Sequence, residues 1–345
     1  MTVTVHDPAA QVINEAHNRI LRFNHERDFA ANQQQPIGGV LYHYTTADGL
    51  KGIIEQNEIW ATSAYYMNDS AEILYGYRVL HLALESWLKE KNLPNDSIAR
   101  GLAESFMHHF GHDALERNIV TPVYLTCFCE DANLLSQWRA YGSSGGYNIG
   151  FRVPMEGIVY GVRPEPRVYT ARCVRVDYDG ERQLQRVRQL LGFLLPILDE
   201  HKVAESIRSI DPTSPLGFSQ LQNTIQEILT EECMGYKDPA FAVEKEWRFV
   251  VRSRSHLKQA TDDGDHTSLP IHFRTARGQL IPYIKFKPNN APTPVVGDGK
   301  QLPIVSVTCG PGGDRISAGM AIRALLDGRG FRAVRVNHSE IPLVF

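Results

Sequence analysis

The stretch from Ala242 to Val251, AVEKEWRFVV, restricts the possible folds of this chain more than any other. Read as a β-strand, it has two different faces, because successive side chains of a strand point to opposite sides. One face is mostly apolar and requires a core, whereas the other carries Glu244, Glu246 and Arg248. Two carboxylates on one strand face lie roughly 7 Å apart, within reach of one small substrate. The stretch predicts a strand bordering a core, with either a solvated charged row or a catalytic acid pair on its other side.

The composition limits the class of protein. The chain has 345 residues, 43% of them hydrophobic, which is enough to bury a large core in two domains or in one elaborated α+β domain. Its net charge of −3 provides no basic footprint for nucleic acid. It has no apolar run approaching the ~20 residues of a membrane span and no signal-peptide pattern at its start. The five cysteines form no C-x-x-C pair. We therefore expect a reduced, cytoplasmic protein with no membrane contact and no metal site.

Hydrophobic periodicity along the chain predicts an α+β fold. Apolar residues at helical spacing indicate helices at about 8–31, 46–57, 71–91, 97–110, 131–141 and 317–327, and across most of 181–235. Residues that favour strands occur at about 40–44, 58–62, 122–129, 147–153, 168–178, 280–286, 304–309 and 333–337. We expect residues 1–37 to form an N-terminal helical extension. Residues 38–345 form the main domain, interrupted by a helical insertion at about 181–236.

Other candidate functional residues lie early in the chain. His43 falls at the end of a predicted strand, just before a helix. A lone histidine is more often structural than functional, but the mouth of a strand-to-helix turn is a favourable place for a site. The loop at 63–72 contains the adjacent aromatic residues Tyr65 and Tyr66. The glycine-rich turns at 142–146 and 310–313 lack the G-K-[ST] and GxGxxG patterns of nucleotide-binding loops, so they are weak indicators.

Four segments of the chain, in this order, resemble a bacterial family catalogued as domain of unknown function 2971. They are LYHYTTADGLKGIIEQNEIWATSAYYMNDSAE, CFCED with LLSQWRAYGSSGGYNIGF, EKEWRFVV, and a strand–GPGGD–helix ending. The strand bearing H-Y-T and the late strand bearing a glutamate also resemble the ADP-ribosyltransferase superfamily, whose members use a histidine, an aromatic residue and an acid in that order. This second resemblance implies a split β-sandwich around a cleft for NAD.

The ADP-ribosyltransferase resemblance implies a role for each matching residue. Glu246 would be the catalytic acid beside the nicotinamide ribose, Glu244 would position or deprotonate the acceptor, and His43 would hydrogen-bond a ribose hydroxyl. Tyr66, or less well Tyr65, would stack on the nicotinamide ring. The remaining NAD contacts would come from Tyr44, Thr45, Ser63, Tyr141 and Arg248. Arg248 would either pair with the pyrophosphate or hold a glutamate ionised, and Trp138 and Tyr141 would line either the cleft or the core.

Three functions remain open from the sequence. The first is an NAD-dependent ADP-ribosyltransferase or NAD glycohydrolase, as in toxin or antiviral defence proteins, that acts on an acceptor of unknown type. The second is a non-catalytic module that binds a nucleotide or a partner on the same fold. The third is a metal-dependent nuclease that uses Glu72, Glu244 and Glu246.

Overall fold

The computed structural model of the chain describes residues 7–33, 39–67, 71–110, 123–141, 146–153, 171–210, 218–252, 271–276, 278–286, 301–312 and 314–342. Its contacts divide the chain into two compact units. The first, which we call the helical unit, consists of residues 1–30, 69–121 and 177–239. The second, the sheet unit, consists of residues 31–68, 122–176 and 240–345. This grouping cuts across the boundary expected at residue 38.

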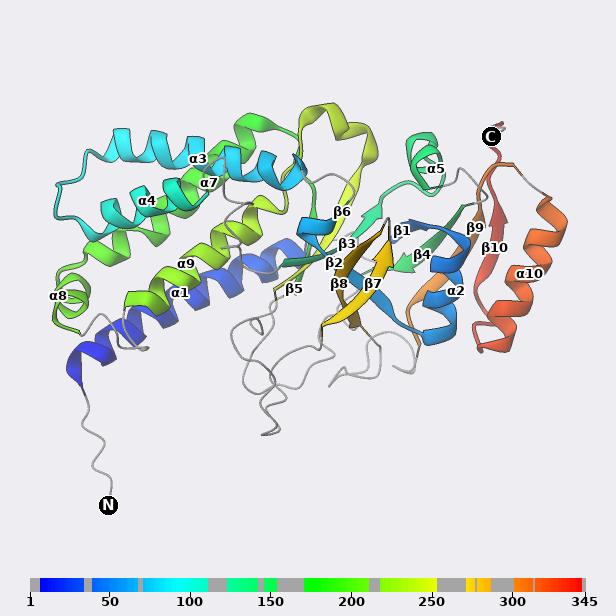
Figure 1. Ribbon diagram of the computed structural model, residues 1–345, viewed down its shortest axis with the longest axis horizontal. Helices are drawn as coiled ribbons and strands as arrows, with labels where there is room; N and C mark the ends of the chain where they lie inside the picture. The colour runs from blue at the N-terminus through cyan, green and yellow to red at the C-terminus, as the bar shows by residue number, and fades with distance from the viewer. Residues whose placement is uncertain are drawn as a thin grey trace, which may run out of the picture. The chain divides into compact units, whose positions relative to one another are not determined.

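The helical unit gathers three stretches of chain that the sequence patterns had assigned separately. Its members are α1 (Pro8–Gln33), α3 (Ala71–Lys91), α4 (Ile98–His109), α7 (Gly180–Leu194), α8 (His201–Ser209) and α9 (Phe218–Cys233) (Figure 1). The N-terminal helix packs on the inserted one, since Nε2 of His17 in α1 lies 2.9 Å from Oγ1 of Thr224 in α9. Close packing of this kind explains why α1 joins the insertion instead of forming a separate extension.

In this unit, a capping residue fixes the start of one helix, and a glycine allows two helices to pack closely. Asp179 caps α7 because its carboxylate accepts hydrogen bonds from the backbone N–H groups of Glu181 and Arg182, both at 3.1 Å. Gly76, in α3, allows a close approach to the end of α9, because a Cβ at this position would lie 2.5 Å from the carbonyl oxygen of Cys233. No helix in the described parts of the chain is long and apolar enough to cross a membrane.

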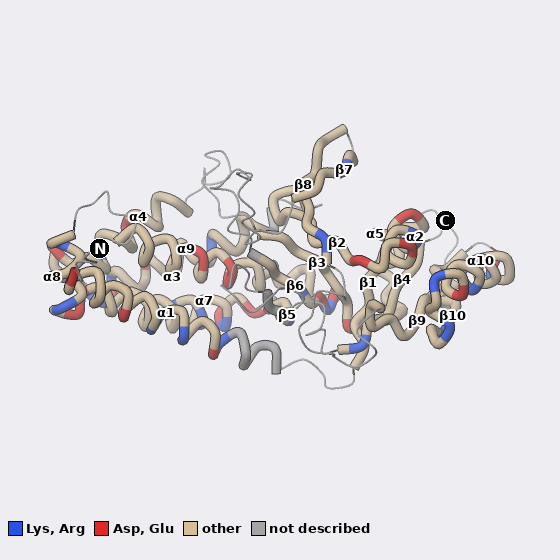
Figure 2. The backbone as a smooth tube through the Cα atoms, turned by 90° about the horizontal axis from the view of Figure 1, so that it is seen from below, with Lys and Arg blue, Asp and Glu red and all other residues tan. Residues whose placement is uncertain are grey.

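The sheet unit is a mixed α+β structure built on a mostly antiparallel, open sheet. Its strands are β1 (Val40–Thr45), β2 (Ile59–Ser63), β3 (Val123–Cys129), β4 (Tyr147–Arg152), β5 (Ala171–Arg175), β6 (Glu246–Arg252), β7 (His272–Ala276), β8 (Gln279–Phe286), β9 (Ile304–Cys309) and β10 (Arg335–His338). Its helices are α2 (Ala47–Gln56), α5 (Leu135–Tyr141) and α10 (Arg315–Gly328). The β7–β8 hairpin extends from the rest of the sheet (Figure 2). The expected α+β class is confirmed, and most strands lie within two residues of their predicted bounds.

Strand β3 is the point at which the sheet divides. The sheet follows the order β10-β9-β4-β1-β3-β2-β8-β7, and β6 pairs with β3 and β5. The Cys129 end of β3 pairs with β1, the Leu125 end pairs with β2, and β6 pairs along the whole length of β3. Between its two short partners, the backbone of β3 therefore needs hydrogen bonds from elsewhere.

The register of the strands gives the sheet two unlike faces. Residues directly opposite each other in an antiparallel ladder share a face. One face, which we call the core face, carries Leu41, Phe128 and Trp247 and packs with Ile54 of α2 and Leu326 of α10 in a single apolar cluster. The other, which we call the polar face, carries Tyr42, Cys129 and Glu246, which stand opposite one another on β1, β3 and β6.

Candidate functional site

A buried ion pair on the polar face is the main candidate for a functional site. Glu246 and Arg248 are only 6% and 3% exposed, and both side chains project from β6. Arg248 donates from Nε to one carboxylate oxygen at 2.9 Å and from a terminal nitrogen to the other at 3.1 Å. Such bidentate pairs fix the orientation of a carboxylate and hold it ionised. The strand therefore presents an oriented negative charge in a site with little access to water.

Of the residues named with Glu246 from the sequence, Arg248 and Tyr44 share this face, since Tyr44 follows Tyr42 by two residues on β1. The face also carries residues that were not named. Cys129 stands opposite Glu246, and Cys127 stands opposite Arg248. Burial raises the pKa of Cys129 to about 11, so its thiol stays protonated at neutral pH and is a poor nucleophile. Tyr42 lies on the same face, where its ring packs over Gly150 of β4. The sequence shows only that Tyr42 and His43 point to opposite faces of β1. It does not show which of these faces carries Glu246, because that depends on the register of β1 with β3 and β6.

Glu244 does not share a strand face with Glu246, so the prediction of an i, i+2 acid pair on one strand is wrong. A 3₁₀ turn spans Pro239–Glu244, and β6 begins only at Glu246. Lys245, between the two acids, has a φ of 48°, in the left-handed region that reverses the alternation of a strand. The carbonyl of Glu244 accepts a hydrogen bond from the Cys129 thiol, at 3.2 Å. The apolar residue Val243 extended the strand pattern in the sequence, but it is 57% exposed.

His43 lies on the core face, opposite to that of Glu246. It stands across from Ile149 of β4 in the ladder, and its ring lies 5.7 Å from that of the buried Phe128. Nδ1 of His43 lies 2.9 Å from the carbonyl oxygen of Cys127. A carbonyl only accepts, so Nδ1 carries the proton. The imidazole thus satisfies the backbone of β3 where β1 and β2 separate, and the structure does not bring it together with Glu246.

The burial of His43 predicts a pH dependence of stability. Desolvation lowers the pKa of this imidazole in the folded protein, whereas an unfolded chain binds the proton near pH ~6.5. Stability is therefore complete above pH ~6.5 and falls as the pH drops below it, by at most about 1.4 kcal/mol per pH unit. Urea unfolding at pH 7.5 and 5.5 measures this loss. His43→Asn keeps a donor for the carbonyl of Cys127 but does not titrate, so its loss should be smaller. An equal loss in both proteins would contradict this role.

Tyr44 and Thr45 have structural contacts that account for them. The Tyr44 hydroxyl donates to the carbonyl of Asp131 at 2.8 Å and accepts from the N–H of Leu134 at 2.9 Å, and burial raises its pKa. The ring is 5% exposed and packs edge-on against Trp138. The Thr45 hydroxyl lies against Gly49, in the first turn of α2. These contacts give both residues a role in joining β1 to α5 and α2.

The other residues named for NAD binding differ in accessibility. Tyr66 lies in the 3₁₀ turn that follows β2 and is 44% exposed, and Tyr141, at the end of α5, is 37% exposed. Ser63, the last residue of β2, is 5% exposed. Thus Tyr66 and Tyr141 present aromatic surface to solvent, as a stacking role requires.

The structure places only two of the three residues proposed for a metal-dependent nuclease. Glu244 and Glu246 belong to different elements, and the side chain of Glu72 lies outside the described residues. In the described ranges, no three His, Cys, Asp or Glu side chains come close enough together to hold a metal ion.

Comparison with known proteins supports one family. The family model described as "Protein of unknown function (DUF2971)" matches residues 137–249, from α5 to the middle of β6. The matched segment contains Trp138, Glu246 and Arg248 but ends short of β9 and begins after β1. No curated protein and no solved structure matches the chain. The match supports the DUF2971 family, which carries no assigned activity.

Proposed function

We propose that the sheet unit is an NAD-dependent ADP-ribosyltransferase or NAD glycohydrolase that uses Glu246 as its catalytic acid. The observation that carries this proposal is the buried, bidentate pair of Glu246 with Arg248 on the polar face of β6. A buried ion pair adds little to stability over an apolar pair of the same size. Buried, oriented carboxylates of this kind occur often at functional sites.

The chemistry of NAD cleavage fits such a carboxylate. The bond between nicotinamide and ribose breaks, its electron pair leaves with nicotinamide, and positive charge develops on the ribose as in glycoside hydrolysis. Glu246 would stabilise this charge, and Arg248 would keep the carboxylate ionised and aligned. Water or an acceptor then attacks the ribose and loses a proton, which Glu244 could accept from the end of its 3₁₀ turn. Tyr66, which is exposed, would stack on the nicotinamide ring.

Two further features support this reading. The division of the sheet at β3 is compatible with the split β-sandwich of that superfamily. The chain order of Tyr66 and Glu246 also agrees with the superfamily order, in which the aromatic residue precedes the acid. His43 is here assigned to the backbone of β3 and not to the ribose, because its Nδ1 is bound to Cys127.

Release of nicotinamide tests the proposal. The purified chain incubated with NAD and candidate acceptors should release nicotinamide, and Glu246→Gln should slow the release by about 100-fold or more, because one oriented charge at the reacting centre is lost. The matched control is Glu340→Gln, which makes the same change at an exposed position. Circular dichroism of each variant checks the fold. Equal rates in Glu246→Gln and wild type, or a wild type that neither binds nor cleaves NAD, would contradict the proposal.

A non-catalytic module that binds a nucleotide or a partner is the second candidate. The observation that favours it is the placement of His43 and Glu246 on opposite faces, since this separates two of the three residues on which the enzymatic resemblance rests. This function predicts that NAD or another nucleotide binds without turnover. It also predicts that Glu246→Gln leaves the cellular phenotype unchanged.

A further inference from the structure

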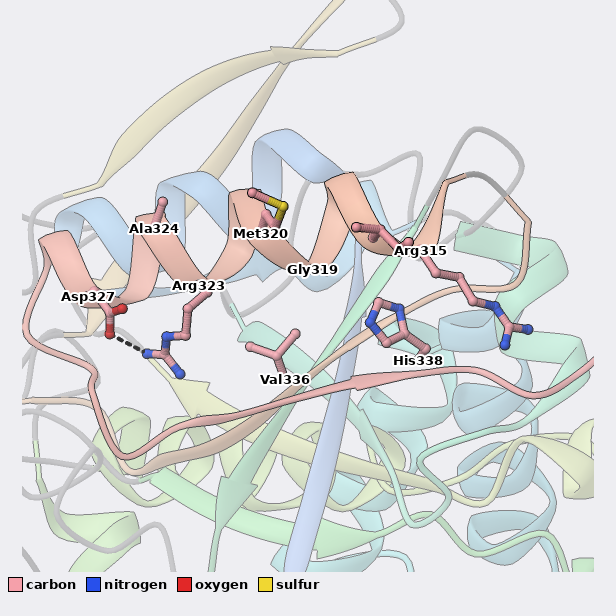
Figure 3. Close-up of a pocket in the computed structure, with 9 residues that line it drawn as sticks. Arg315, Gly319, Met320, Arg323, Ala324, Asp327, Val336 and His338 are labelled. Carbon is pink, nitrogen blue, oxygen red and sulfur yellow. Dashed lines mark ion pairs between the residues drawn. The ribbon is translucent and has the colours of Figure 1, made fainter.

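A groove lies between α10 and β10, at the end of the sheet where the strand order begins. It has a volume of about 780 Å³, and Figure 3 shows Val336 and His338 of β10 pointing toward the helix above them. Gly319 forms part of the helix wall, because a Cβ there would lie 3.1 Å from Nε2 of His338. Glycine inside a helix is destabilising relative to alanine. Gly319 nevertheless occupies the position where a larger residue would contact the ring of His338.

The strand that floors the groove has a free edge. Among the described residues β10 pairs only with β9, in parallel, so its second edge offers unpaired backbone N–H and C=O groups. Such edges are templates for another extended chain, and proteins usually cover or block them. Val336 and His338 face the groove (Figure 3). Arg335 and Asn337 alternate with them along β10, so they face the other way.

The side chains around the free edge of β10 indicate which kind of peptide would bind there. Ile316 and Met320, on the groove side of α10, are 76% and 70% exposed, which is unusual for large apolar residues. Arg323 is fixed as a wall, since it donates to the carbonyl of Val334 at 2.7 Å and pairs with Asp327 at 2.8 Å. Within the described parts of the chain, Arg315 and Arg335 have no ion-pair partner. The groove is thus mostly apolar, and the two arginines beside it are available to pair with acidic groups.

We propose that β10 and α10 bind an extended peptide segment of a partner protein in which apolar and acidic residues alternate. The segment would add to the free edge of β10 as the next strand. Alternate side chains of a strand point to opposite faces, so its apolar residues would enter the groove against Met320 and Val336. Its acidic residues would then lie beside Arg335 on the other face. This inference is independent of the activity proposed for Glu246.

The charges also decide between two kinds of occupant. If the β10 strands of two copies of this chain paired, the Arg335 side chains of the two copies would repel each other. No acidic residue of β10 would balance their charge. An acidic segment meets no such repulsion. The observations therefore favour a different partner over a second copy.

A synthetic peptide tests the proposal. The probe is a short, fluorescein-labelled peptide of alternating Val and Glu, and its binding is measured by fluorescence anisotropy. We expect saturable binding to the wild-type chain. Met320→Glu should weaken this binding at least about tenfold, because it removes the apolar wall of the groove. Ala321→Glu is the matched control, since it adds the same charge to an exposed residue of α10 outside the groove, and it should bind as wild type does.

Further probes separate the parts of the proposal. A peptide of alternating Val and Lys, and a block peptide with four Val followed by four Glu, should both fail to bind. Alternate backbone N–H groups of the peptide point to opposite edges, and only one edge pairs with β10. N-methylation of the residues whose N–H groups point to β10 should abolish binding, whereas N-methylation of the other residues should leave it unchanged. No binding by the wild type, or equal weakening by Met320→Glu and Ala321→Glu, would overturn the proposal. A dimer in sedimentation velocity that Met320→Glu dissociates would also overturn it, in favour of a second copy.

Discussion

Replacement of Arg248 with methionine is expected to lower the free energy of unfolding of the sheet unit by about 3–5 kcal/mol. The reason is that the carboxylate of Glu246, only 6% exposed, would lose the bidentate cation that balances its buried charge. Methionine keeps most of the length and volume of the side chain, so a cavity contributes little. Urea unfolding followed by tryptophan fluorescence measures the change, and Trp247 is the neighbour of this pair in β6.

The double replacement Glu246→Leu with Arg248→Met is the control for this prediction. This variant removes the two opposite charges together, and buried ion pairs replaced by apolar residues of similar size are often as stable as before. The double variant should therefore be clearly more stable than Arg248→Met alone. If the two are equally unstable, the loss comes from packing around Arg248, and the pair does not act as a unit. If Arg248→Met has no effect, the charge of Glu246 reaches water in the folded state.

The same pair illustrates what a sequence can predict. The pattern EWRFVV predicted a strand with a core face and a charged face, and the structure has both. The buried partner of Glu246 is two residues away, so it could be named from the sequence. Contacts at this range depend only on the two-residue period of a strand, which the sequence carries directly.

The relation between His43 and Glu246 could not be predicted in this way. A shift of one residue in the pairing of β1 with β3, or of β3 with β6, would exchange their faces. The register depends on contacts between strands that are far apart in the chain, and no local pattern encodes it. Lys245 adds a second reason, because its left-handed backbone conformation has no glycine or asparagine to mark it.

The grouping of α1 with α9 escaped prediction for a related reason. An amphipathic stripe shows that a helix has a buried face but does not identify its partner. The polar segment at 32–39, which follows the N-terminal helix, suggested a linker between this helix and a separate domain. The hydrogen bond between His17 and Thr224 joins residues about two hundred positions apart. Neither residue type indicates in the sequence that the other is its partner.

Replacement of Trp138 with alanine is the second change with a large expected effect, about 3–5 kcal/mol of unfolding free energy. The indole is fully buried, its ring packs edge-on against Tyr44 at 4.8 Å, and its N–H donates to Asn133 Oδ1 at 2.9 Å. Gly310 lies against the same ring, since a Cβ there would be 3.0 Å from it and 2.8 Å from the carbonyl oxygen of Gly146. Backbone this close to the ring cannot collapse into the space that alanine leaves, so the cost of the cavity stays high. Urea unfolding measures it.

Two matched variants separate the packing of Trp138 from its hydrogen bond. Trp138→Phe keeps an aromatic ring, and Asn133 Oδ1 still accepts a hydrogen bond from the Ser339 hydroxyl at 2.6 Å, so this variant should lose less than half as much as alanine. Leu135→Ala, on the same helix but 38% exposed, should change the unfolding free energy by less than about 1 kcal/mol. If Trp138→Phe were as unstable as Trp138→Ala, the hydrogen bond and not the ring would hold α5 to β1. The aromatic contact with Tyr44 would then be incidental to the fold.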